Sequence, residues 1–203
     1  AAAQTPASAV VIPKVGSVDY LDQVSARLDA AGAHADMRIW AMIETPTAVF
    51  DVRAIAAHWR VAALVMGTND LARELRSQLG AAGRHPLVPH LATALAGARE
   101  AGKIVLDGVY NDVKDLDGFR TECVQGFEMG FDGKTAIHPS QVPVINRVFS
   151  PTSEEVERAR AIVDVMEKAL SEGRNVATLE NEMVEALHLK RARRILARAE
   201  TGS

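Results

Sequence analysis

The chain has 203 residues, of which 48% are hydrophobic and 24% are charged, which is enough apolar material for one core. Its formal net charge of −3 provides no basic surface of the kind that nucleic-acid binding requires, so we expect no nucleic-acid partner. No apolar run approaches the roughly 20 residues of a membrane span, and the N-terminus lacks the basic start of a secretory signal. Cys123 is the only cysteine, and we interpret it as a packed small hydrophobe. We therefore expect a cytoplasmic protein with no membrane contact.

Strand-like and helix-like segments alternate over the first 150 residues. Continuous apolar runs predict strands at 9–15, 38–44, 62–67, 104–110 and 130–137. Helical spacing of apolar residues predicts helices at 18–32, 47–59, 70–79, 87–102, 115–130 and 138–149. Five strand–helix units in a row indicate parallel strands with right-handed crossovers. Both an open doubly wound sheet and part of a (β/α)8 barrel fit this pattern.

The pattern changes after residue 150. Thr152 and Ser153, followed by Glu154 and Glu155, indicate the start of a long charged helix. A polar connection at 173–182 and a final basic helix at 185–200 follow. We expect residues 1–150 to form one domain and residues 151–203 to form a helical C-terminal arm that contacts a neighbouring subunit.

Glu44 and Asp70 stand at the ends of two successive predicted strands. The carboxyl ends of neighbouring parallel strands face the same side of a sheet, about 5 Å apart. Two carboxylates held there repel each other unless a proton or a cation intervenes, and a hard cation prefers oxygen ligands. The pair therefore predicts a magnesium site, although Asn69 or Asp70 could instead cap the following helix.

A second polar cluster lies in the segment GFDGKTAIHPSQ at 130–141. Lys134 and His138 flank the end of the predicted fifth strand, where either could meet an anionic substrate. Lys14, after the first strand, is a third candidate for substrate binding. His138 could equally cap the helix that it precedes, and Lys134 could face water. No phosphate-binding glycine fingerprint, serine-nucleophile elbow or paired Cys/His zinc spacing is present.

Six motifs together resemble the citrate lyase β-subunit-like family of CoA-ester lyases, which includes citramalyl-CoA and malyl-CoA lyases and a related malyl-CoA thioesterase. They are IPKVGS, AMIETP, LVMGTNDLA, LDGVYND, GFDGKTAIHPSQ and INRVFSPTSEEVERARAI. The resemblance runs from about Pro13 to the C-terminal helix. It implies a (β/α)8 barrel that lacks about its first three strands, including a strand whose arginine binds the keto-acid part of the substrate. The intact protein is then expected to be longer.

The same resemblance places Mg²⁺ on Glu44 and Asp70 and implies an acyl-CoA substrate and a homo-oligomer, a trimer or a hexamer. Relatives draw a catalytic acidic residue from the arm of a neighbouring subunit, in a motif like M-[IV]-D-A. Here the matching residues are Met183, Val184, Glu185 and Ala186. Glu185 replaces the usual Asp, so its carboxylate reaches about one methylene farther.

Three functions follow as hypotheses. The first is a Mg²⁺-dependent carbon–carbon lyase that cleaves a 3-hydroxyacyl-CoA of the citramalyl-CoA or malyl-CoA type to a 2-keto acid and an acyl-CoA. The second is a malyl-CoA thioesterase that uses the same site. The third is a non-catalytic or partner-dependent lyase subunit.

Overall fold

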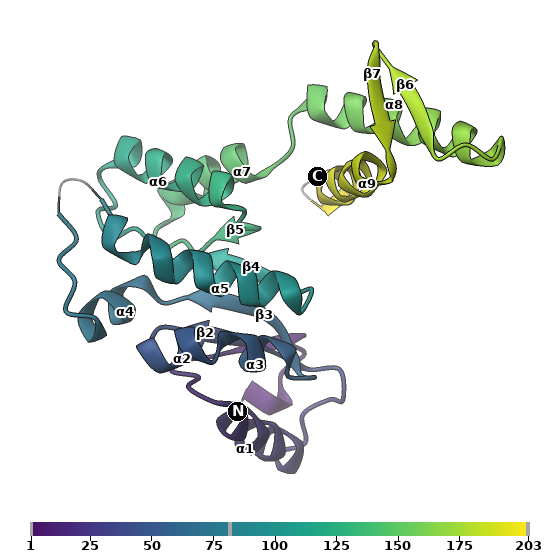
Figure 1. Cartoon of the computed structure of the whole chain (residues 1–203). Helices are drawn as coiled ribbons and strands as arrows, with labels where there is room; N and C mark the ends of the chain where they lie inside the picture. The colour runs from purple at the N-terminus through teal and green to yellow at the C-terminus, as the bar shows by residue number, and fades with distance from the viewer. Residues whose placement is uncertain (1, 81–82, 202–203) are drawn as a thin grey trace. The chain divides into compact units, whose positions relative to one another are not determined.

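A computed structural model describes residues 2–80 and 83–201. The chain divides into two compact units, with the division between Val148 and Phe149. The sequence places the same change of pattern two residues later, at 150. Each unit has its own sheet and helices (Figure 1).

The first unit is an α/β structure built on a five-stranded parallel sheet. The strands are β1 (Ala9–Ile12), β2 (Arg38–Ile43), β3 (Val61–Met66), β4 (Ile104–Asp107) and β5 (Gly133–Lys134). Their order in the sheet is their order in the chain, and every neighbouring pair is parallel. The five predicted strands are therefore confirmed, although β1, β4 and β5 are shorter than the apolar runs that predict them. A doubly wound sheet reverses its strand order at a switch point, and no such reversal occurs among these five strands.

Helices follow each strand. They are α1 (Val18–Ala30), α2 (Pro46–Phe50), α3 (Val52–Ala57), α4 (Thr68–Glu74), α5 (Val88–Glu100), α6 (Leu116–Met129) and α7 (Val142–Phe149), with short 3₁₀ turns η1 (Ala2–Gln4), η2 (His85–Leu87) and η3 (Pro139–Gln141). Caps fix several starts, since Ser17, Thr45 and Asp115 each accept a hydrogen bond from a backbone N–H of the first turn.

Two predicted helices differ from the observed ones. The helix expected at 47–59 is interrupted at Asp51, which separates α2 from α3. The helix expected at 70–79 begins at Thr68 and ends at Glu74, and Arg76 then adopts a left-handed backbone at φ 54. Helical spacing of apolar residues does not reveal such a local turn.

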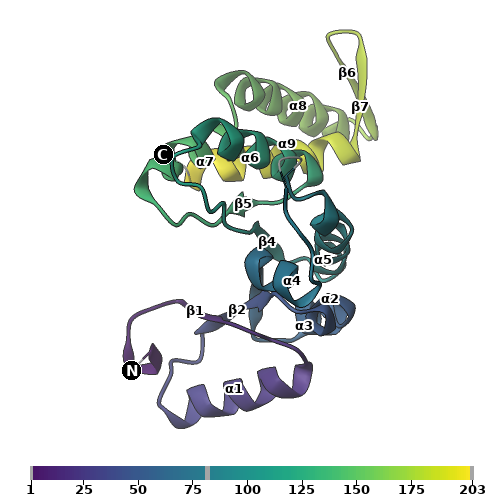
Figure 2. The same ribbon diagram turned by 90° about the vertical axis from the view of Figure 1, so that its left-hand side faces the viewer.

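One face of the sheet is covered by helices and the other is not. Ile39, Ala41 and Ile43 of β2 are fully buried, and α3 and α5 pack against the sheet and against each other (Figures 1 and 2). The opposite face carries a row of paired apolar residues in which Ala63 of β3 is buried, whereas Val11 and Ile104 are half exposed and Trp40 is 36% exposed. Parallel sheets are normally covered on both faces, so this row marks an apolar surface that the described residues leave open.

The second unit contains α8 (Ser153–Ser171), β6 (Val176–Leu179), β7 (Glu182–Glu185) and α9 (Ala186–Thr201). Thr152 and Glu155 form the predicted capping box at the start of α8. The expectation of a purely helical arm is wrong, because residues 173–182 do not form a loop but enter an antiparallel hairpin. Glu180 and Asn181 both have positive φ values, 51 and 68, as a two-residue hairpin turn requires.

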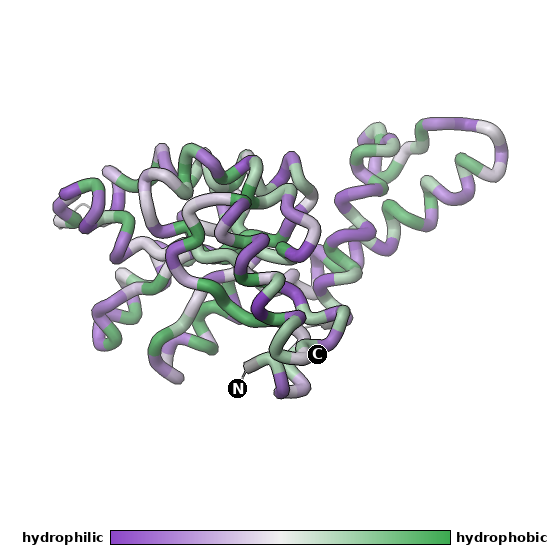
Figure 3. Tube along the Cα trace, turned by 90° about the horizontal axis from the view of Figure 1, so that it is seen from below, coloured by the Kyte–Doolittle hydropathy of each residue, from purple (hydrophilic) through white to green (hydrophobic). Residues whose placement is uncertain are grey.

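The hairpin closes a small core of its own. Ala177 and Val184 are buried against Met166 and Ala169 of α8 and Leu189 of α9. Hydrophobic and hydrophilic residues alternate along the helical traces of both units, as amphipathic helices require (Figure 3). None of the described helices is long and apolar enough to cross a membrane.

Candidate metal and substrate site

Three successive strands deliver polar groups to one edge of the parallel sheet. Lys14 follows β1, Glu44 follows β2, and Asp70 lies in the first turn of α4, after β3. Because neighbouring strands of a parallel sheet end on the same side, the sheet order places these three positions side by side. The arrangement is the one that the strand pattern predicts for Glu44 and Asp70.

Glu44 is enclosed from two directions. It is only 5% exposed, and its Oε1 accepts a hydrogen bond of 2.7 Å from the backbone N–H of Lys14. A Cβ atom at Gly67 would lie 2.4 Å from the Glu44 Cβ and 2.6 Å from Oε2. Gly67 therefore leaves the room that the Glu44 carboxylate occupies, a role that the sequence pattern does not reveal.

The two carboxyl groups are neighbours at this edge of the sheet and interact electrostatically. Burial raises the pKa of Glu44 above its usual value, the Lys14 N–H bond opposes this shift, and the neighbouring Asp70 carboxyl raises the pKa further. A divalent cation between the groups would remove the repulsion and favour the ionised form of both. Oxygen donors from two carboxylates suit Mg²⁺, which takes few protein ligands and keeps water or substrate in its other positions.

Asp70 does not cap α4. The helix begins at Thr68 after Gly67, so neither Asn69 nor Asp70 is its N-cap residue, and that alternative is wrong. The Asp70 side chain is 27% exposed and pairs with Arg73 at 2.5 Å. In residues 2–80 and 83–201, no group of three or more His, Cys, Asp or Glu side chains is placed to hold a metal. A metal at this edge would therefore rely on the Glu44–Asp70 pair.

Lys134 lies in a buried charge cluster. Its ammonium contacts Asp107 Oδ2 at 2.9 Å and Glu122 Oε1 at 2.8 Å, and its side chain is fully buried. Arg84 completes the cluster with a bond of 2.5 Å to Asp107 Oδ1. This placement differs from the sequence-based expectation, because the ammonium that was to meet a substrate is already paired with two carboxylates. The cluster ties β4 and β5 to α6.

His138 is exposed and caps the helical turn that follows it, which is the second of the two roles that the sequence allows. Its Nδ1 accepts the backbone N–H of Ser140 at 3.2 Å, at the start of η3. Contact between His138 and a substrate stays a prediction. Cys123 is fully buried, and burial raises the pKa of its thiol to about 11, which confirms its interpretation as a packed residue.

A pocket of about 340 Å³ opens beside the start of α4. Thr68 and Asn69 line one side of it, and Tyr110 and Asn111 line another. Asn69 and Asn111 exchange two amide hydrogen bonds of 2.9 and 2.7 Å, which join the segments that follow β3 and β4. The Tyr110 hydroxyl donates to Asp115 Oδ2 at 2.6 Å, and this bond raises its pKa to about 12.

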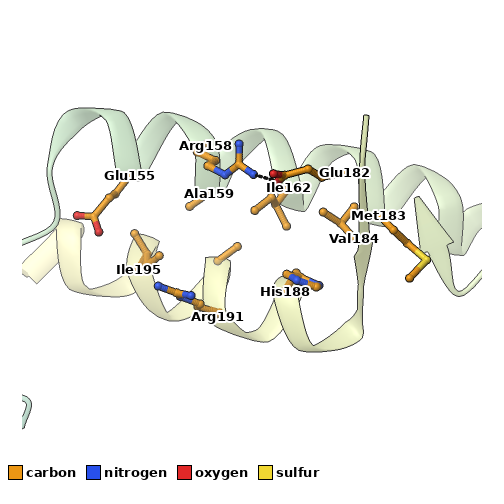
Figure 4. A pocket seen from close by; sticks show the side chains of 11 residues that line it. Glu155, Arg158, Ala159, Ile162, Glu182, Met183, Val184, His188, Arg191 and Ile195 are labelled. Carbon is orange, nitrogen blue, oxygen red and sulfur yellow. Dashed lines mark hydrogen bonds and ion pairs between the residues drawn. The ribbon is translucent and has the colours of Figure 1, made fainter. Parts of the chain in front are cut away.

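Glu185 belongs to the second unit. It is the exposed last residue of β7, and its backbone N–H donates to His188 Nδ1 at 3.2 Å. Beside it, α8, β7 and α9 enclose an apolar groove of about 230 Å³ (Figure 4). Ile162, Val184 and Ile195 point into the groove, and His188 and Arg191 lie along its α9 side. The catalytic role of Glu185 stays a prediction.

Comparison with known proteins identifies the family. The family model described as HpcH/HpaI aldolase/citrate lyase matches residues 2–139, and the chain belongs to this family. A (3S)-malyl-CoA thioesterase of Cereibacter sphaeroides is 43% identical over 198 residues, which cover 98% of this chain and 67% of the relative. An L-malyl-CoA/β-methylmalyl-CoA lyase of Rhodobacter capsulatus is 31% identical over 94% of this chain and 67% of its own length. The chain thus spans about two thirds of these enzymes, whose names describe action on CoA esters.

Two solved structures show the same fold. The protein CitE of Mycobacterium tuberculosis, in complex with magnesium, acetoacetate and coenzyme A, is 27% identical with a TM-score of 0.68, covering 95% of this chain and 78% of that one. A citrate lyase from Burkholderia xenovorans, at 22% identity, has a TM-score of 0.82 and covers 98% of this chain and 66% of its own. Magnesium is therefore a metal of solved relatives, in agreement with the cofactor that the carboxylate pair predicts.

Proposed function

We propose that the chain carries the metal-binding part of a Mg²⁺-dependent carbon–carbon lyase that cleaves a 3-hydroxyacyl-CoA of the citramalyl-CoA or malyl-CoA type. The observation that carries the proposal is the buried carboxyl of Glu44 with the carboxyl of Asp70 as its neighbour, on the segments that follow two adjacent parallel strands. A buried carboxyl beside a second carboxyl is costly for folding, and a bound cation offsets that cost. Such an arrangement is typical of a site built for function rather than for stability.

Glu44 and Asp70 are the residues that would hold Mg²⁺. When bound, the metal supplies Lewis-acid polarisation of a substrate oxygen and neutralises negative charge. The buried position of Glu44 and its bond from the Lys14 N–H fix one ligand before the metal arrives. The pocket beside Thr68 and Asn69 gives room next to this edge for part of a larger ligand.

The proposed reaction begins with loss of the proton from the substrate 3-hydroxyl. The carbon–carbon bond then breaks, its electron pair passes to the acyl-CoA part as an enolate, and a 2-keto acid is released; protonation of the enolate gives the acyl-CoA. Glu185 is the proposed base, supplied by a neighbouring subunit of a homo-oligomer of trimer or hexamer size. Its exposed position at the end of β7 is compatible with contact to another subunit.

The open face of the sheet supports the proposed barrel. Five parallel strands in sequential order, with helices on one face only, form the kind of sector that a (β/α)8 barrel contains. Among the residues that the structure describes, β1 pairs only with β2 and β5 pairs only with β4, so both edges can accept further strands. About three additional strands would close the barrel and cover Val11, Trp40 and Ile104.

Hydrolysis of malyl-CoA by the same site is the second candidate. It is favoured by the 43% identity to a malyl-CoA thioesterase across almost the whole chain, against 31% to a malyl-CoA lyase. Glu185 in place of the family Asp adds a second reason, because a shift of about 1 Å in a catalytic base can change the rate of one step by about 100-fold.

Incubation of the purified protein with malyl-CoA, with and without Mg²⁺, distinguishes the two reactions. The lyase releases glyoxylate and an acyl-CoA, whereas the thioesterase releases malate and free CoA without glyoxylate. We expect glyoxylate, dependent on Mg²⁺ and lost in Glu44→Gln. Free malate without glyoxylate would replace the first proposal by the second, and absence of any Mg²⁺-dependent product from either malyl-CoA or citramalyl-CoA would contradict both.

A further inference from the structure

The helix that carries Asp70 does not fix its own start. α4 has only 7 residues, and it begins after Gly67 with no side-chain cap. Helices this short are unstable on their own in water, and a side-chain cap normally stabilises the first turn. The position of Asp70 in the first turn of α4 therefore depends on contacts from outside the helix.

Two such contacts come from the segment that follows β4. Gly108 lies against Thr68, since a Cβ atom at Gly108 would lie 2.4 Å from Thr68 Oγ1 and 2.5 Å from Thr68 Cγ2. Farther along the same segment, Asn111 and Asn69 join their side-chain amides by reciprocal hydrogen bonds of 2.9 and 2.7 Å. Thr68 and Asn69 immediately precede Asp70 in α4, so both contacts act directly beside the proposed metal ligand.

The segment that supplies Asn111 is itself held in place. Gln141 is fully buried, and its Nε2 donates to the backbone carbonyl of Tyr110 at 3.0 Å. The Tyr110 hydroxyl donates to Asp115, the N-cap residue of α6. Because Asn111 follows Tyr110 directly, the amide that bonds to Asn69 extends from a fixed backbone.

We propose that Asn111 is a positioning residue for Asp70: through its amide pair with Asn69 it holds the first turn of α4 against the segment that follows β4. The inference rests on the proposed function, because it takes Asp70 as a ligand of Mg²⁺. The role requires no contact between Asn111 and the metal or the substrate. Both asparagines are exposed, so their hydrogen bonds compete with water and contribute little to the stability of the whole fold.

Calorimetric titration of Mg²⁺ into variants of the full chain tests the amide pair. Asn111→Ala and Asn69→Ala each remove both hydrogen bonds, and we expect each to bind Mg²⁺ about fivefold more weakly, the effect of losing a hydrogen-bonded pair of neutral groups. The double variant should also lose about fivefold, because the second change has no bond left to remove. Asn146→Ala, at an exposed position of α7, is the control and should leave the affinity unchanged.

Hydrogen exchange of the metal-free protein provides a second measurement. The N–H of Leu71 bonds to the Gly67 carbonyl at 3.0 Å, so its exchange rate reports whether the first turn of α4 stays closed. We expect Asn111→Ala to raise the exchange rate at Leu71 by about fivefold while the urea midpoint of unfolding changes little. A general loss of stability would instead lower the urea midpoint.

Wild-type affinity for Mg²⁺ in Asn111→Ala, or exchange at Leu71 as slow as in wild type, would overturn the inference while leaving the metal site intact. A roughly 25-fold loss of Mg²⁺ affinity in the double variant would also overturn it, because the two asparagines would then act independently. Wild-type protein that binds no Mg²⁺ would overturn the proposed function, and the inference with it.

Discussion

Gly67 shows how a residue without a side chain can determine the site. Any Cβ at this position would overlap the Glu44 side chain, so the close approach of β2 and β3 at this edge depends on glycine. The sequence motif contains this glycine, but nothing in its spacing relates it to Glu44. The carboxylate pair itself is predictable from the sequence because each residue follows closely after a strongly apolar strand.

Gly67→Ala is expected to displace the Glu44 carboxylate and to weaken Mg²⁺ binding by about tenfold or more, since small displacements of a ligand are costly. Gly16→Ala is the matched control, because a Cβ at Gly16 meets no atom within 4 Å. Calorimetric titration of Mg²⁺ into both variants measures the difference. Equal affinity for Gly67→Ala and wild type would contradict the packing described for this edge.

The raised pKa of Glu44 predicts a pH-dependent cost to stability. Burial, as the largest cause, raises the folded-state pKa above the ordinary value of 4.5, so the folded protein retains this proton at a pH where the unfolded chain has lost it. The free energy of unfolding therefore falls as the pH rises from 4.5 through the folded-state pKa. The cost persists at neutral pH in the absence of metal.

Glu44→Gln removes that cost while keeping an acceptor for the Lys14 N–H. In a buffer with a chelator at pH 7, we expect the variant to melt at a higher temperature than wild type, because it buries no charge at this position. At pH 4 the difference should largely disappear. Thermal unfolding followed by circular dichroism at both values measures it, and a variant less stable than wild type at pH 7 would contradict a destabilising Glu44.

At the scale of elements, the buried charge cluster joins β4, β5 and α6 through Asp107. Asp107 is fully buried and pairs with both Arg84 and Lys134, and Glu122 supplies the second carboxylate that balances these two cations. The sequence could not reveal this cluster, because its contacting members are separated by 12 to 38 residues and follow no common period. The sequence pattern therefore predicts a substrate contact for Lys134 and assigns no role to Arg84.

Asp107→Asn should lower the free energy of unfolding by about 3–5 kcal/mol, because it leaves the two buried cations with Glu122 as their one remaining carboxylate partner in the cluster. Glu100→Gln is the control, since the Arg53–Glu100 pair is exposed and such pairs contribute about 0–1 kcal/mol. Urea unfolding of both variants gives the comparison. Similar losses for the two would show that the Asp107 cluster contributes no more than a surface ion pair.

The sequence pattern does not predict the hairpin of the second unit, because its turn residues are not typical of a hairpin. Its turn uses Glu180 and Asn181 with positive φ, whereas the sequences most typical of such a turn pair Asn or Asp with Gly. The polar segment therefore resembled a connection between helices. On the core side the described strands contribute Ala177, Val184 and the partly buried Leu179, and three apolar residues over two short strands are too few to define a period.

For the whole molecule, the sequence predicts the order of strands and helices well and the closure of the fold poorly. Apolar runs locate all five parallel strands because a buried parallel strand has a continuous apolar signature. They do not decide whether the sheet closes into a barrel, since closure depends on strands outside the five. The exposed apolar face around Trp40 and the two open sheet edges indicate that further strands complete the sheet. Both features are visible only in the three-dimensional structure.

Calorimetric titration of Mg²⁺ into the purified chain tests the central claim most directly. We expect one saturable Mg²⁺ site in the wild-type protein, and we expect Glu44→Gln and Asp70→Asn to lose it. Glu100→Gln should retain the site, because the carboxylate of Glu100 lies on the exposed surface of α5. Absence of saturable Mg²⁺ binding in the folded wild-type protein, or undiminished binding in both site variants, would contradict the assignment of Glu44 and Asp70 as a metal site.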